Sequence, residues 1–185
     1  MTREQRREML DSFGRAPGQL LVTLRTFPKK MWAYKPLPDR WSIHEIILHL
    51  ADAEANSYVR CRRFIAEPGT SLAKIDAGRW AGSLGYFHQS TREALEVIRR
   101  LRKMTHQLLV SVPESVWLHT AEHPRDGSIT LEHWVQLQER HIPHHVEHMR
   151  ANYELWSKTH PPRKSARGAA RPSSSASQRL AGAAV

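Results

Sequence analysis

The chain has 185 residues, 40% of them hydrophobic, which is enough apolar material for the core of one globular domain. It has no apolar run near the roughly 20 residues of a membrane span, and its charged N-terminal stretch is unlike a secretory signal. The single cysteine, Cys61, excludes an intrachain disulfide. Together these features predict a cytoplasmic protein without a membrane segment.

Four segments have the apolar spacing and the end signals of long helices. They cover residues 3–26, 42–66, 91–111 and 130–156. Gly14 and Pro17 are expected to bend or split the first of them. The second begins with a capping box, in which Ser42 and Glu45 satisfy the first free backbone N–H groups, and Thr130 can cap the fourth.

The connections between these helices contain most of the turn-forming residues. Residues 27–40 hold three prolines and predict an extended connection, and residues 69–89 and 113–129 are predicted to be loops. No alternating strand pattern and no internal repeat is visible in the sequence. We therefore predict an all-α fold, a four-helix bundle with a long loop after the second helix.

Charge is distributed unevenly between the predicted bundle and the C-terminal stretch. Residues 158–185 hold six of the 28 Lys and Arg residues and none of the 18 Asp and Glu residues, so they carry +6 of the net +10. This stretch is rich in Pro, Ser, Ala and Gly and has no aromatic residue. We therefore predict a folded domain over residues 1–157 and a basic, disordered tail over residues 158–185. A charge concentrated in a tail gives nucleic-acid binding little support.

Five of the twelve histidines fall within the fourth predicted helix. The run His141-Ile-Pro-His144-His145-Val-Glu-His148 contains two pairs spaced four residues apart, and such a pair lies on one helical face, close enough to bind one metal ion. At about 100° per residue, His141 and His145 lie at the edge of the apolar stripe, whereas His144 faces solvent. The pair 141/145 is therefore favoured, although Pro143 between its members is expected to kink the helix.

A third ligand must come from another helix, and His49 in the second helix is the best candidate. It lies at the edge of that helix's apolar stripe, as His141 and His145 do in theirs. Three neutral imidazoles leave at least one position on a divalent ion for water or substrate, as in catalytic sites. The alternative is that these histidines are ordinary surface or half-buried side chains.

Three further residues of the second helix carry reactive groups. Glu54 lies close to the apolar stripe, and a buried carboxylate needs a partner, so it is a candidate general base or orienting group for a ligand. The alternative for Glu54 is a hydrogen bond across the bundle. Asp52 either orients His49 or faces water. Cys61 is predicted to be a small buried hydrophobe rather than a nucleophile.

The residues around these histidines resemble the DinB/YfiT-like family of metal-binding four-helix proteins. The first motif is Trp41-Ser-Ile-His-Glu45-Ile-Ile-Leu-His49-Leu, which is similar to the family's W-S-x-x-E-x-x-x-H-L. The second combines Thr130-Leu-Glu-His-Trp134 with His141-Ile-Pro-His-His145, which is similar to T-x-x-x-W followed by H-x-x-x-H. The resemblance covers nearly the whole predicted domain and is specific in these two motifs.

The resemblance implies that His49, His141 and His145 bind one divalent ion (Zn, Ni, Fe or Mn), often in a homodimer. His148 stands where the family frequently has glutamine, which makes it a candidate extra ligand. Related members are thiol-dependent S-transferases, which use low-molecular-weight thiols, or hydrolases. We therefore predict a metal-dependent enzyme that activates water or a thiol toward a small-molecule substrate.

Two other functions remain as alternatives. A non-enzymatic metal-binding or stress-response protein would bind the ion without turnover and would have no pocket beside it. A nucleic-acid-binding protein is suggested by the basic tail, and its DNA binding would depend on salt concentration and on residues 158–185.

Overall fold

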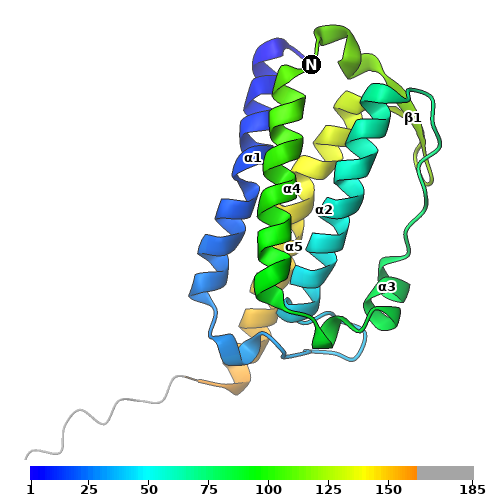
Figure 1. Cartoon of the computed structure of the whole chain (residues 1–185). Coiled ribbons are helices and arrows are strands. Elements are labelled where there is room, and N and C mark those ends of the chain that lie inside the picture. Colours follow the sequence, from blue (N-terminus) through cyan, green and yellow to red (C-terminus); the bar gives the residue numbers. More distant parts are fainter. Residues whose placement is uncertain (162–185) are drawn as a thin grey trace, which may run out of the picture.

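The structure is a computed structural model that describes residues 1–161 (Figure 1). Four long helices form the bundle: α1 (Arg3–Thr26), α2 (Ile43–Ala66), α4 (Thr91–Ser111) and α5 (Leu131–Thr159). The predicted all-α four-helix bundle is therefore confirmed, with helix ends close to those expected. Most of the predicted tail, residues 162–185, lies outside the described residues. Within residues 1–161, no helix is long and apolar enough to cross a membrane.

Polar side chains fix where the long helices begin. The Ser42 hydroxyl accepts a hydrogen bond from the Glu45 backbone N–H at 3.2 Å, and the Glu45 carboxylate accepts one from the Ser42 N–H at 2.9 Å. This confirms the predicted capping box of α2. Thr130 caps α5 in the predicted way, because its hydroxyl accepts from the His133 N–H at 3.1 Å.

The first helix is not split at Gly14 or Pro17, so that part of the expectation is wrong. α1 is continuous, and Pro17 is buried in the interface together with Phe13 and Leu20. This packing offsets the backbone hydrogen bond that proline cannot make. A Cβ atom at Gly14 would lie 2.9 Å from the ring of His106, so glycine permits the close approach of α1 and α4.

The predicted loops contain short elements that the sequence pattern does not reveal. The first connection includes η1 (Lys29–Met31), and the second includes α3 (Ala77–Ser83) and η2 (Tyr86–His88). The third contains η3 (Glu114–Leu118) and an antiparallel hairpin. Its strands are β1 (Thr120–His123) and β2 (Gly127–Thr130), with Ala121 opposite Ile129. Strands of four residues are too short to show a reliable alternation, which is why the hairpin was not predicted.

The bundle interior has two apolar clusters with a polar layer between them. In that layer Arg102 of α4, fully buried, donates from Nε to Glu54 Oε2 at 2.9 Å and forms a second bond to the other carboxylate oxygen. Its guanidinium also lies 3.9 Å from the ring centroid of Phe13 and donates to the Gln138 carbonyl at 3.2 Å. Arg102 therefore connects all four long helices.

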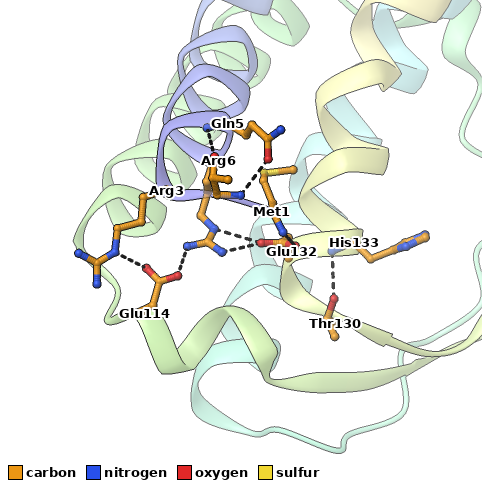
Figure 2. Close-up of polar contacts among 9 residues, drawn as sticks. Met1, Arg3, Gln5, Arg6, Glu114, Thr130, Glu132 and His133 are labelled. Atoms are coloured by element: carbon orange, nitrogen blue, oxygen red, sulfur yellow. Dashed lines mark hydrogen bonds and ion pairs between the residues drawn. The ribbon is translucent and has the colours of Figure 1, made fainter.

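A second arginine joins the helices near the N-terminal end of α1. Figure 2 shows Arg6 between Glu114 and Glu132, to which it donates at 2.5 Å and 2.6 Å. Its guanidinium also lies 4.8 Å from the ring centroid of Trp117. These contacts attach α1 to η3 and to the first turn of α5.

Candidate metal centre

The three predicted ligands meet between α2 and α5. One ring nitrogen from each of His49, His141 and His145 can be chosen so that all three atoms lie within 4.8 Å of one another. The Nε2 atoms of His141 and His145 are 3.2 Å apart. The ring of His49 faces both, with centroid distances of 5.4 Å and 4.8 Å. The structure therefore brings together the residues that the two sequence motifs indicated.

Helix geometry explains why His141 and His145 converge. Residues four apart lie one turn above each other on the same face, and α5 continues without interruption from Leu131 to Thr159. Pro143 lies between the two ligands but is exposed on another face. The ring centroids of the pair are only 4.7 Å apart. The proline therefore leaves the spacing of the pair intact.

Burial keeps all three imidazoles neutral. It lowers the pKa of His49 to about 4, although the nearby Asp52 carboxylate acts in the opposite direction. Burial likewise lowers the pKa of His141 to about 3, and the neighbouring His49 and Arg102 add to the effect. The pKa of His145 falls to about 2 because the ring is buried beside other histidines. At neutral pH each ring thus has a free lone pair, which is the form that binds metal.

The cluster fits a divalent ion. Two nitrogens that each lie about 2.0–2.1 Å from one tetrahedral ion are separated by about 3.3 Å, close to the spacing found for His141 and His145. Imidazole is a good ligand for Zn, Ni, Cu and Fe, so the donor set indicates a transition metal without choosing one. Three protein ligands leave at least one position open.

The wall beside His49 is formed by Trp41, whose ring centroid is 4.8 Å away. The Trp41 carbonyl accepts a hydrogen bond at 2.8 Å from the side chain of Asn152, which is buried in α5. The capping box at Ser42 holds the next residue of the chain. These contacts fix the segment before α2 against α5 and keep Trp41 beside the cluster.

A cleft of about 350 Å³ leads to the cluster and has His145 in its lining. The other lining residues are Asp39, Arg40, Trp41, Ile46 and His148. A larger cavity of about 720 Å³ lies between α1 and α5, but none of the three ligands lines it. Of these two cavities, only the smaller cleft is lined by one of the three histidines.

The carboxylates near the cluster have partners of their own. Glu54, the candidate general base, directs both oxygens to Arg102, so the structure does not bring it into the cluster. Asp52 accepts a hydrogen bond from the Tyr86 hydroxyl at 2.5 Å, and burial together with this bond raises the pKa of Tyr86. Neither carboxylate hydrogen-bonds to His141 or His145, whose buried Nδ1 atoms have no partner among residues 1–161.

His148 and Cys61, the other two candidates from the sequence, lie outside the three-histidine cluster. His148 is exposed and lines the cleft, but it is not part of the three-atom cluster. Cys61 is fully buried, and burial raises its pKa to about 12, which agrees with a small hydrophobe. Sequence reasoning missed Arg102, although its helical phase could have found it, because Arg102 falls on the apolar stripe of α4 between Ile98 and Leu109.

Comparison with known proteins agrees with this geometry. Residues 12–149 match the sequence profile of the DinB superfamily. A protein of Oceanobacillus iheyensis, OB0782, is 28% identical over 109 residues, which cover 59% of this chain and 63% of that protein, slightly under two thirds of its length. YfiT of Bacillus subtilis is 21% identical over 150 residues, covering 80% and 84% of the two chains. Both carry the name "Putative metal-dependent hydrolase".

A solved structure of Bacillus subtilis YfiT has the same fold. Its TM-score is 0.77 at 20% sequence identity, and the match covers 86% of this chain and 90% of that one. That protein is described as "a probable metal-dependent hydrolase with an unusual four-helix bundle topology". The sequence profile spans most of the described residues and includes all three histidines of the cluster. The chain therefore belongs to the DinB superfamily.

Proposed function

We propose that the protein is a metal-dependent hydrolase that acts on a small molecule at the cluster of His49, His141 and His145. The observation that carries this proposal is the convergence of three neutral imidazoles beside an open cleft. The names of the relatives support the same reaction class. A purely structural ion would be expected to have four protein ligands and no access for a substrate.

The chain's own residues have separate tasks in this proposal. The three histidines would hold a divalent ion, which when bound supplies Lewis-acid chemistry and makes water a better nucleophile at neutral pH. Trp41 covers the cluster beside His49 and limits access of bulk water on that side. The cleft beside His145 admits the substrate. Arg102 lies near enough to His141 to oppose its protonation.

The ligand assignment is tested by metal content. The purified full chain is stripped with a chelator, reloaded separately with Zn, Ni, Mn or Fe, and its bound metal is measured by elemental analysis. Wild type should retain about one ion per chain, and His49→Ala or His141→Ala should retain under about a tenth of that. His144→Ala is the matched control, because it removes an exposed histidine of the same run. Full metal retention in both ligand variants would refute the site.

The reaction class is tested on activated esters and other small electrophiles, with and without an added low-molecular-weight thiol. Turnover that follows the metal content and needs no thiol is the expected result. Turnover that occurs only with thiol would replace hydrolysis by thiol transfer at the same site. A protein that retains metal but turns over none of these compounds would favour a non-enzymatic metal-binding protein.

A further inference from the structure

The cleft beside His145 contains an arginine without an acidic partner. Arg40 is half-buried and lines the cleft. Within residues 1–161, no carboxylate lies within ion-pair distance of its guanidinium. A guanidinium that is partly removed from water gains most from an anion, and its planar fork matches carboxylate and phosphate oxygens. Arg40 therefore has unused capacity to bind an anion where a substrate would enter.

The backbone at Arg40 is held by a bond to a residue before it and by the contacts of the residue after it. Its backbone N–H donates to the Leu37 carbonyl at 3.1 Å, which closes a turn in the preceding segment. The next residue, Trp41, is held by the hydrogen bond from Asn152 and by contact with His49. A group whose backbone is already placed loses less entropy when it binds a ligand. The anchor also links Arg40 directly to the wall of the metal centre.

The charges that face the cleft favour an anion once a metal ion is present. Asp39 is the one acidic residue among the described residues of the lining, and it is exposed at the rim. It offsets the positive charge of Arg40, which is the one arginine or lysine that residues 1–161 contribute to the lining. A divalent ion on the histidine cluster would then leave the cleft with a net positive charge. The same arrangement predicts that Asp39 weakens anion binding.

We propose that this cleft binds small substrates that carry an oxyanion, a carboxylate or a phosphate, with that group on Arg40 and the reacting bond toward the histidine cluster. The inference rests on the proposed function, and it adds the substrate class. A volume of about 350 Å³ is at the lower end for small-molecule sites, so the substrate is a small metabolite rather than a polymer.

The test measures binding to the metal-free full chain, followed by the indole resonance of Trp41 in NMR spectra and assigned with Trp41→Phe. The probes are butanoate and inorganic phosphate, and butanamide is the uncharged counterpart. At least one of the two anions should bind about tenfold more tightly than butanamide, because its bond to the guanidinium is charge-assisted. Arg40→Gln should remove this difference. Equal binding of all three probes to wild type would overturn the proposal.

Two further variants separate a local effect from a change in fold or in net charge. Asp39→Asn should tighten anion binding, because it removes the competing carboxylate. Arg150→Gln removes the same charge as Arg40→Gln, but Arg150 is exposed, pairs with Glu147 at 2.8 Å and lies outside the cleft. It should leave binding unchanged. If Arg150→Gln weakened binding as much as Arg40→Gln, the effect would be one of net charge and the proposal would fail.

Repeating the titration on zinc-loaded protein distinguishes this proposal from the proposed function. Anion binding that needs zinc and survives Arg40→Gln would place the anion on the ion itself. That result would overturn the role of Arg40 and leave the metal centre standing. Anion binding that depends on Arg40 in a chain that retains none of Zn, Ni, Mn or Fe would support the anion site and refute the metal-dependent hydrolase.

Discussion

Acid should destabilise the metal-free protein, mainly through the three histidines of the cluster. In the unfolded chain each ring regains a pKa near 6.5, whereas burial holds His49, His141 and His145 at about 4, 3 and 2. Between pH 6.5 and about 4 the unfolded chain therefore binds protons that the folded chain does not. Each ring should lower the free energy of unfolding by up to about 1.4 kcal/mol per pH unit as the pH falls. The three rings together should lower it by up to about 4 kcal/mol per pH unit.

Urea denaturation of the metal-free chain at pH 7, 6, 5.5 and 5 measures this slope. His145→Gln removes one of the three titrating rings, so the fall in stability between pH 6 and pH 5 should be about one third smaller than in wild type. His144→Gln is the control, because it changes an exposed ring and should leave the slope unaltered. A slope in His145→Gln equal to that of wild type would show that His145 does not titrate as a buried group.

Three other substitutions test the structure around the centre, each by urea denaturation at pH 7. Arg102→Met should lower the free energy of unfolding by about 3–5 kcal/mol, because it leaves the buried Glu54 carboxylate without its partner. Adding Glu54→Leu should recover most of that free energy. An Arg102→Met variant as stable as wild type would contradict the ion pair. Ser42→Ala should lower the free energy of unfolding by about 1 kcal/mol, because it removes the cap of α2. A variant as stable as wild type would argue against the capping box. Pro143→Ala should stabilise the chain by about 1–3 kcal/mol, because the helix interior regains a backbone hydrogen bond, and should leave metal content unchanged.

Several features of the fold could be predicted because they depend on local sequence. The capping box at Ser42 and the cap at Thr130 place the starts of α2 and α5, since the bonds involved join residues three apart. The spacing of His141 and His145 puts both rings on one helical face in any straight helix. The choice of this pair over 144/148 followed from the apolar stripe, and in the structure it is His141 and His145 that lie beside His49. His49 was identified because it lies at the edge of a second stripe and within a specific motif.

The roles of Glu54, Asp52 and Arg40 depend on contacts between segments far apart in the chain. Glu54 looked like a candidate base because its position predicted burial, but its partner Arg102 comes from another helix, 48 positions away. Asp52 likewise pairs with Tyr86, which reaches it from the connection after α2. Such pairings are determined by how the helices pack, and the sequence of one helix does not contain that information.

The sequence by itself therefore determined the four helices, the caps of α2 and α5, and the three histidines of the candidate cluster. Those features follow from hydrogen bonds and side-chain spacing within single helices. Only the tertiary structure decided that the three rings meet, that burial keeps them neutral, and that Glu54 is paired with Arg102. It also placed Arg40 in the lining of the cleft, because the anchoring bond joins Asn152 of α5 to the segment before α2.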